Sequence, residues 1–225
     1  PPPPPPPPPP PFFFHTTTRP PPILSGLVGS EMCIRDSNGL TDQAHPCQAL
    51  ADMLTIAEHR AGNPEGAKLT YIGVYNNVVN SLVSIAAALG VRLTLVCPIR
   101  DEGAVDLESR QRLLDAGLLT ETSDAALAVS DADYVYTDTW LDMEYFNDPE
   151  YEQEKQRRCD LMLPYQVNAT LMAGSEARIM HDMPIHPGFE ITEEMVECEQ
   201  SIIYDQAENR LDAQKAIMLY LLQGL

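Results

Sequence analysis

The sequence predicts an α/β protein built on a doubly wound parallel sheet, with a remnant of a second α/β domain. From residue 38 onward, short stretches rich in β-branched and aromatic residues alternate with longer segments whose apolar residues recur every three or four positions. Alternating strands and amphipathic helices are typical of parallel sheets that carry helices on both faces. Such sheets bind ligands at the carboxyl ends of their strands, where this chain places several asparagine and aspartate residues. We therefore expect the functional residues to gather at that edge.

The first 37 residues do not contribute to this fold in our interpretation. The chain opens with eleven consecutive prolines, and 14 of its 21 prolines lie in residues 1–22. Proline lacks a backbone donor and favours an extended polyproline II form, which joins neither a helix nor a sheet. Residues 23–37 resemble a translated sequencing adaptor, and their apolar part is too short to span a membrane. We expect residues 1–37 to be non-native or disordered; a native proline-rich tail that binds a partner is the alternative.

The ordered part begins with a turn at residues 38–42, and a helix over 46–59 follows with proline in its first turn. Glycine and proline in residues 62–66 end this helix. The later elements are expected as strand 68–73, helix 80–89, strand 92–97, helix 107–116, strand 119–121, helix 123–129, strand 133–137, helix 149–158, helix 166–173, strand 178–181, helix 192–197 and strand 201–204.

A helix over residues 205–219 is expected to close the chain. One of its faces carries apolar residues at three- and four-residue spacing, which predicts that this face packs and the opposite face is solvated. These residues are Ala207, Leu211, Ala213, Ala216, Ile217 and Tyr220. The same helix carries Arg210, which either serves a ligand or pairs with its neighbours Glu208 or Asp212.

The charge balance excludes several classes of partner. Residues 1–37 contain two basic and two acidic side chains, so the whole formal charge of −19 falls on residues 38–225. Nucleic acids and anionic membranes are bound through Lys and Arg, so neither is expected as a partner. We expect a soluble, cytoplasmic protein. The widely spaced cysteines of residues 38–225 favour reduced thiols over disulfides or a zinc site; they are Cys47, Cys97, Cys159 and Cys198.

Two motifs stand at opposite ends of the ordered part. One is Asn38-Gly-Leu-Thr-Asp-Gln-Ala-His-Pro-Cys-Gln48, and the other is Asp205-Gln-Ala-Glu-Asn-Arg210. They resemble motifs of the aspartate/ornithine carbamoyltransferase family, in particular those of its ornithine-type members. The resemblance implies that His45 donates a hydrogen bond to the carbonyl oxygen of carbamoyl phosphate, that Gln48 meets its amide, and that Arg210 grips it. By residue type alone, a histidine before proline is more often a cap or a packing residue.

A third motif of this family follows the predicted strand 68–73. The run Tyr71-Ile-Gly-Val-Tyr-Asn-Asn-Val-Val-Asn-Ser81 is similar to the family's Gly-Asp-x-x-Asn-Asn-x-x-x-Ser turn. The resemblance implies that Asn77 holds the carboxylate of an acceptor amino acid. Helix capping by Asn76 and Asn80 is the alternative that the residue types favour.

A fourth motif follows the predicted strand 133–137, in the run Asp133-Tyr-Val-Tyr-Thr-Asp-Thr-Trp-Leu-Asp-Met143. Its resemblance to the family implies that Asp138 receives the amino end of the acceptor, and that Asp142 and Met143 line the acceptor pocket. Asp142 departs from the family, which has serine there. Solvated loop carboxylates are the alternative for both aspartates.

The last motif is Met180-His-Asp-Met-Pro-Ile-His-Pro-Gly188. It resembles a family motif in which a cysteine touches the amine of the acceptor, and Asp182 stands in that cysteine's place. Met183 replaces the next residue, leucine, and the resemblance places both in the acceptor pocket. The bond between Met183 and Pro184 is a candidate cis peptide bond.

Together the motifs imply an ornithine-type carbamoyltransferase that moves the carbamoyl group of carbamoyl phosphate to an amine, as from ornithine to citrulline in arginine biosynthesis. Its catalytic residues would be His45, Arg210, Asp138 and Asp182, with no cofactor and no metal, and the full-length parent would be a homotrimer. The family's Ser-x-Arg-Thr-Arg phosphate cradle has no counterpart here, so we expect a fragment. Its expected parts are residues 38–64 from the carbamoyl phosphate domain, an acceptor-binding domain over 65–205 and a crossing helix over 206–225.

Two alternatives to ornithine carbamoyl transfer remain open. One is a carbamoyltransferase for another amine, such as a diamine, because Asp142 and Asp182 add negative charge to the expected acceptor pocket beside Asp138. The other is a catalytically silent module that binds an amino acid.

Overall fold

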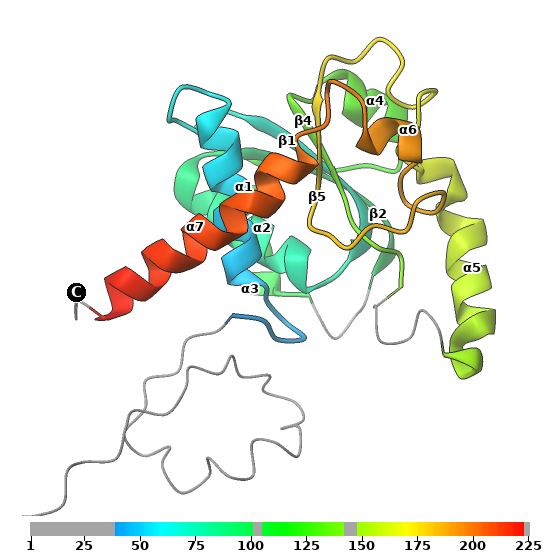
Figure 1. Cartoon of the computed structure of the whole chain (residues 1–225), viewed down its shortest axis with the longest axis horizontal. Helices are drawn as coiled ribbons and strands as arrows, with labels where there is room; N and C mark the ends of the chain where they lie inside the picture. Colours follow the sequence, from blue (N-terminus) through cyan, green and yellow to red (C-terminus); the bar gives the residue numbers. More distant parts are fainter. Residues whose placement is uncertain (1–38, 101–104, 142–147, 223–225) are drawn as a thin grey trace, which may run out of the picture.

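The computed structural model describes residues 39–100, 105–141 and 148–222, and its centre is a five-stranded sheet in the order β3-β2-β1-β4-β5. Neighbouring strands are parallel throughout this sheet. The strand order reverses at β1, because β2 and β3 lie on one side of it and β4 and β5 on the other (Figure 1). The strands are β1 (Lys68–Tyr75), β2 (Arg92–Arg100), β3 (Leu119–Glu121), β4 (Tyr134–Thr137) and β5 (Arg178–His181).

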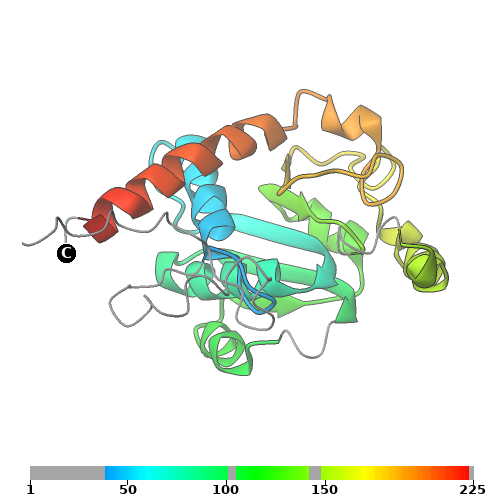
Figure 2. The same ribbon diagram turned by 60° about the horizontal axis from the view of Figure 1, so that its bottom comes forward.

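Helices cover both faces of the sheet, which Figure 2 shows nearly edge-on. Short 3₁₀ turns over Pro149–Tyr151 and Leu163–Tyr165 flank one of them. The α-helices are α1 (Pro46–Glu58), α2 (Asn77–Leu89), α3 (Leu107–Asp115), α4 (Ala125–Ser130), α5 (Glu152–Met162), α6 (Glu193–Val196) and α7 (Ile203–Leu222).

Alternate residues of the strands feed two separate cores. Leu69 and Tyr71 of β1 are fully buried against residues of α1, α2 and α3. Ile72 of β1 and Val135 of β4 point to the other face, where α4 and α6 pack. The period-two alternation of β1 thus buries both of its faces, as expected for a parallel strand covered by helices. The predicted doubly wound α/β fold is confirmed.

Two predicted elements are wrong. The segment 166–173 is a series of turns, because the side chain of Asn168 accepts the amides of Thr170 and Leu171, while the Val167 amide bonds to the carbonyl of Glu190. The segment 201–204 is not a strand: Ser201 makes a single bridge to β5, and α7 already begins at Ile203.

Several boundaries also differ from the prediction. Helix α2 begins at Asn77, because the side chain of Asn76 caps its first amides. The capping alternative given for Asn76 is therefore correct, whereas Asn80 lies inside the helix. Strands β1 and β2 are longer than expected, and α5 runs to Met162 after the 3₁₀ turn that begins at Pro149.

The predicted packing face of the closing helix is wrong except at Ala213, which is buried, and at Ile217, which is half-buried. Leu211 and Tyr220 are 59% and 58% exposed, whereas the buried residues of α7 are Ile203, Gln206, Asn209 and Ala213. The reason is that α7 packs across α1 through hydrogen-bonded polar side chains. A prediction from apolar periodicity places such polar residues on the surface. No helix in the described ranges is long and apolar enough to cross a membrane.

Candidate active site

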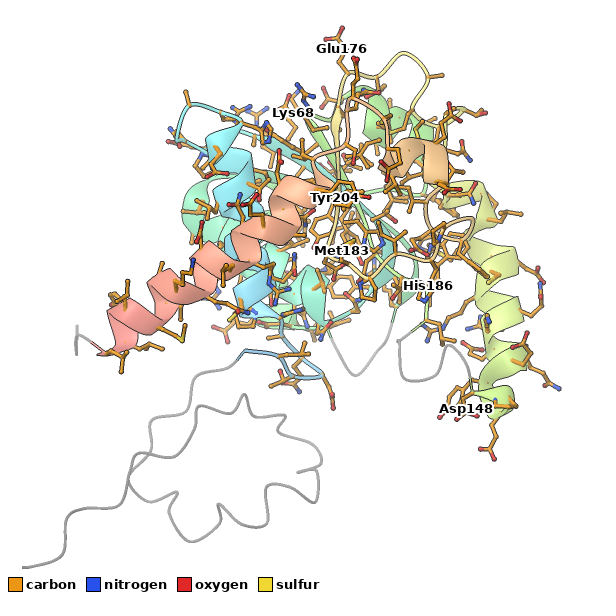
Figure 3. All side chains as sticks on the ribbon, in the orientation of Figure 1. Lys68, Asp148, Glu176, Met183, His186 and Tyr204 are labelled. Atoms are coloured by element: carbon orange, nitrogen blue, oxygen red, sulfur yellow. The ribbon has the colours of Figure 1, made fainter. Side chains whose placement is uncertain are left out.

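The predicted site residues lie at the carboxyl edge of the sheet, around the point where the strand order reverses. Asn76 and Asn77 follow β1, Asp138 follows β4, and Asp182 follows β5. In Figure 3, Met183 and His186 lie toward this edge, while Lys68 at the start of β1 lies toward the opposite one. Backbone topology therefore gathers residues that are distant in the sequence, as the parallel sheet predicts.

Asp138 is held by several donors at the end of β4. It is 5% exposed, and its Oδ2 accepts a hydrogen bond of 2.7 Å from Nδ2 of Asn76. Its Oδ1 accepts the backbone amide of Thr139 at 2.6 Å, and the Tyr71 hydroxyl lies 3.5 Å from Oδ2. Asn76 thus caps α2 with its oxygen and orients Asp138 with its amide. From the sequence, only the capping role of this residue was predicted.

Asn77 does not point into an open crevice. Its Nδ2 donates to the carbonyl of Thr41 at 2.7 Å, and Nδ2 of Asn80 donates to the carbonyl of Gln43 at 2.9 Å. These bonds fasten the segment before α1 onto the start of α2. An acceptor carboxylate at Asn77 would have to replace the Thr41 carbonyl, so the predicted role of Asn77 stays a prediction.

His45, Gln48 and Arg210 come together although Gln48 and Arg210 are 162 residues apart in sequence. The guanidinium of Arg210 donates through Nη1 to Oε1 of Gln48. This contact replaces the alternative pairing of Arg210 with a neighbour on α7, since Asp212 forms its ion pair with Lys215 at 3.0 Å. The packing of α7 on α1 brings the two motifs into one site.

His45 is uncharged at neutral pH in this site. Burial, followed by the charge of Arg210, lowers its pKa to about 4, against the effect of a hydrogen bond to the backbone of Gly39. Nδ1 of His45 has no hydrogen-bond partner among the described residues. A neutral ring carries one N–H, so a ring that donates to the Gly39 carbonyl presents only a lone pair at Nδ1. Donation to a substrate carbonyl therefore requires the ring to release Gly39.

We expect the His45→Gln variant to lose less stability in acid than the wild type. The unfolded chain binds a proton near pH 6.5 but folded His45 does so only near pH 4, so stability that is present above pH 6.5 is lost as the pH falls through this window. The loss is about 1–3 kcal/mol. Urea unfolding at pH 4.5 and 7.5 measures this loss of unfolding free energy, and His59→Gln serves as the control variant. Equal acid losses in His45→Gln and wild type would contradict the assignment.

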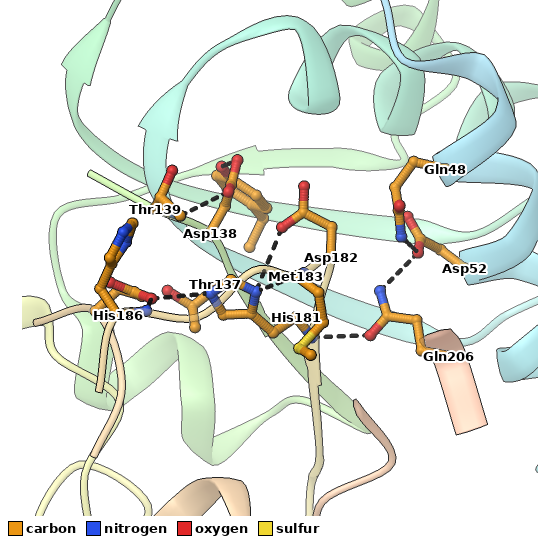
Figure 4. A network of polar contacts seen from close by, with 12 residues as sticks. Gln48, Asp52, Thr137, Asp138, Thr139, His181, Asp182, Met183, His186 and Gln206 are labelled. Carbon is orange, nitrogen blue, oxygen red and sulfur yellow. Dashed lines mark hydrogen bonds and ion pairs between the residues drawn. The ribbon is translucent and has the colours of Figure 1, made fainter. Parts of the chain in front are cut away.

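A buried network that the sequence analysis missed connects the two halves of the site. Oδ1 of Asp52 accepts hydrogen bonds from Nε2 of Gln48 at 2.8 Å and from Nε2 of Gln206 at 2.6 Å. The other end of Gln206, Oε1, accepts the backbone amide of His181 at 2.8 Å. Asp52 therefore fixes the Gln48 amide with its oxygen toward Arg210, and Gln206 ties α7 to the end of β5 (Figure 4).

Asp182 and Met183 follow β5 directly. The Asp182 side chain is 10% exposed, and burial, followed by the charge of Asp138, raises its pKa well above the usual range. Met183 is 41% exposed, has a φ of 57°, and precedes a cis bond to Pro184 as the sequence analysis suggested. Asp142 and Met143, the other residues predicted for the acceptor pocket, lie outside the described residues.

A surface cavity of about 490 Å³ opens nearby, between α1 and α2. Its lining includes Leu50, Asn80 and Asp106, but none of the predicted catalytic residues. The cavity and the polar site are therefore distinct features of this edge.

The comparisons with known proteins all indicate the same family. Residues 65–221 match the family profile described as aspartate/ornithine carbamoyltransferase, Asp/Orn binding domain. The ornithine carbamoyltransferase of Methanoculleus marisnigri is 41% identical over 189 residues, covering 83% of this chain and 59% of the relative. That of Halalkalibacterium halodurans is 43% identical over 194 residues, covering 83% and 58%. The chain thus spans about 60% of the length of these curated relatives.

Solved structures of the same family resemble this fold. The ornithine carbamoyltransferase from Pyrococcus furiosus superposes with a TM-score of 0.69 at 37% identity, covering 80% of this chain and 57% of that one. An N-acetyl-L-ornithine transcarbamylase, complexed with carbamyl phosphate and N-succinyl-L-norvaline, superposes with a TM-score of 0.68 at 29% identity. That match covers 87% of this chain and 61% of the other. Solved structures named for two different acceptors, ornithine and N-acetyl-L-ornithine, thus share this fold.

Proposed function

Because the chain belongs to the aspartate/ornithine carbamoyltransferase family, we propose that it is the acceptor-binding part of an enzyme that transfers a carbamoyl group from carbamoyl phosphate to an amine. The observation that carries this proposal is the meeting of His45, Gln48 and Arg210, at the packed pair α1 and α7, beside the carboxyl edge of the sheet. Cationic and neutral donors then stand on one side of the site. Carboxylates for an amine stand on the other, at the ends of β4 and β5.

The reaction needs stabilisation of negative charge on the carbamoyl oxygen when the amine attacks. Arg210 supplies a permanent positive charge, and Gln48 presents an amide that Asp52 orients. In our proposal, neutral His45 turns from the Gly39 carbonyl and donates to the carbamoyl oxygen, where a preorganised donor is worth several kcal/mol, roughly 3–4. Asp138 accepts the amino end of the acceptor, and Asn77 its carboxylate.

We further propose that the acceptor is an amino acid of the ornithine type, with citrulline as product and arginine biosynthesis as the setting. The names of the relatives support this choice. A different amine is the second candidate, favoured by Asp182 at a position where the family motif has cysteine. Residues 38–64 and 206–225 would belong with the carbamoyl phosphate domain, residues 65–205 would form the acceptor domain, and the complete protein would be a cytoplasmic homotrimer.

The test joins residues 38–225 to the amino-terminal part of one of the relatives and measures carbamoyl transfer from labelled carbamoyl phosphate. Ornithine, N-acetylornithine, 1,4-diaminobutane and aspartate serve as acceptors. We expect product formation by the fusion and little by the 225-residue chain, because a phosphate without its arginine contacts loses charge-assisted hydrogen bonds worth about 1.5–3 kcal/mol each. A folded fusion that binds these amines without transferring the label would contradict the proposal and favour a silent binding module.

A further inference from the structure

The segment that carries His45 lies along the first turns of α2. Nδ2 of Asn80 donates to the carbonyl of Gln43 at 2.9 Å, and the backbone amide of His45 donates to Oγ of Ser81 at 2.7 Å. Both side chains come from buried residues, since Asn80 is 4% and Ser81 is 7% exposed. Hydrogen bonds that are shielded from water in this way make the local structure rigid. Helix α2 therefore holds the chain before α1 at two alternate residues, and the second of them is His45.

The hydroxyl of Ser81 is oriented to accept the His45 amide. It donates its one proton to the carbonyl of Asn77, four residues earlier, at 3.2 Å, so a lone pair is left for His45. The helix is firmly seated at this point, because its residues Val79 and Leu82 are fully buried in the core. The Ser81 oxygen thus has both a fixed place and a fixed direction.

The backbone of His45 is held on both sides. Its carbonyl accepts the amides of Gln48 and Ala49 in the first turn of α1, at 3.2 Å each, while Ser81 holds its amide. Pro46 disfavours the helical conformation at the residue before it, and His45 has a φ of −128° and a ψ of 63°. The ring can still turn about its side-chain bonds, as the proposed function requires. It turns about a Cα atom that α1 and α2 have placed.

We propose that Ser81 is a positioning residue for carbamoyl transfer, whose hydroxyl oxygen holds the backbone of His45 where the ring reaches the carbamoyl oxygen. The inference rests on the proposed function for the role of that ring. A donor acts on a developing charge only over a narrow range of distance, and a displacement of about 1 Å lowers a rate by roughly 100-fold. Loss of the Ser81 oxygen leaves the His45 amide to water, and the ring is then free to move relative to Arg210.

Valine and threonine at position 81 test the oxygen itself, because the two side chains have nearly the same shape and differ in one hydroxyl. Ser81 lines the surface cavity of about 490 Å³, so the added methyl groups have room. Threonine in a helix can make the same bond to the carbonyl four residues earlier. The matched control is Ser84→Ala, which removes an exposed hydroxyl from the same helix and the same cavity. Asn80 still holds Gln43 in every variant, so we expect all of them to fold.

Two measurements on the 225-residue chain need no substrate. We expect the His45 amide to exchange with solvent at least about 10-fold faster in Ser81→Val than in wild type, and at the wild-type rate in Ser81→Thr and Ser84→Ala. The pKa of His45, followed by NMR, should rise from about 4 toward 6.5 in Ser81→Val alone, because the ring leaves its buried place. The charges that act on this ring are Arg210 on α7, which lowers the pKa, and Asp138 after β4, which raises it.

The fusion that tests the proposed function measures the consequence for the reaction. We expect Ser81→Val to lower kcat roughly 10- to 100-fold with both KM values nearly unchanged, and Ser81→Thr to recover most of the loss. If Ser81→Val does not fold, Ser81→Ala takes its place in every measurement.

A folded Ser81→Val with the kcat of wild type, or with unchanged exchange and pKa of His45, overturns the inference and leaves the proposed function intact. Such a result would assign Ser81 to the packing of α2. If the wild-type fusion transfers nothing, the proposed function fails instead. The exchange and pKa of His45 in the 225-residue chain then still decide whether Ser81 positions this residue.

Discussion

Replacing Arg210 with alanine is expected to lower kcat/KM for carbamoyl phosphate by about 100-fold or more in the complete protein. The guanidinium is the permanent cation that acts on both His45 and Asp52 in the described site. Its loss removes charge-assisted hydrogen bonds to a dianion, and two such bonds at about 1.5–3 kcal/mol each correspond to this factor or more. The fold should persist, because Gln206 and Asn209 continue to fasten α7 to α1.

Steady-state kinetics with each substrate varied in turn measure the effect, and acceptor binding should change much less than carbamoyl phosphate binding. Lys215→Ala is the matched control on the same helix, since it removes a cation that forms an exposed ion pair with Asp212. Arg210→Lys should recover part of the activity, because it restores the charge without the planar fork that reaches Gln48. An Arg210→Ala enzyme with wild-type kinetics would assign the residue to the packing of α7 alone.

The fold class was readable from the sequence because its signals are local. Short stretches rich in β-branched and aromatic residues alternate with helical segments, and this alternation predicts a parallel sheet without any knowledge of contacts. The failures occur where tertiary contacts decide. Asn168 turns the chain with its side chain at a segment whose apolar spacing suggests a helix, and β5 takes only a single bridge from Ser201.

The site was predictable to the extent that short motifs mark it. Motif matching selected His45, Gln48 and Arg210, and the packing of α7 on α1 brings them together. Asp52 and Gln206 were not predicted as site residues, because a polar residue in a helix is normally assigned to the solvated face. Their burial follows from the way two helices cross, which periodicity within one helix does not reveal.

Replacing Asp52 is expected to have the second large effect, on the stability of the fold. It is fully buried, and its Oδ1 accepts the amides of both Gln48 and Gln206. Alanine at this position leaves both amides without an acceptor, at about 1–3 kcal/mol for each unsatisfied donor. We therefore expect Asp52→Ala to lower the free energy of unfolding by about 2–6 kcal/mol and to release the Gln48 side chain from its orientation toward Arg210.

Asparagine at position 52 should behave differently, and the difference depends on pH. Burial raises the pKa of Asp52 to about 7, against hydrogen bonds from Gln206 and Gln48. The folded state thus holds the proton more tightly than the unfolded state, so the stability that this group contributes is present below about pH 4 and is lost as the pH rises through 7. Asp52→Asn keeps the acceptor oxygen and does not titrate. Its unfolding free energy relative to wild type should therefore rise by about 4 kcal/mol between pH 4 and 8.

Urea unfolding of wild type, Asp52→Asn and Asp52→Asn/His45→Gln across that range measures this rise. The double variant separates the contributions of His45 and Asp52 to the pH dependence of the unfolding free energy. The contribution of His45 lowers stability as the pH falls, whereas that of Asp52 lowers it as the pH rises. The charge of Arg210 also acts on Asp52. Repeating the series in Arg210→Ala should therefore raise the pKa of Asp52 and extend its loss of stability to higher pH, because a cation that favours the ionised carboxylate has been removed. A constant difference between wild type and Asp52→Asn at every pH would show that the buried carboxyl keeps one protonation state throughout, and the Gln48–Asp52–Gln206 network would then act through hydrogen bonding alone.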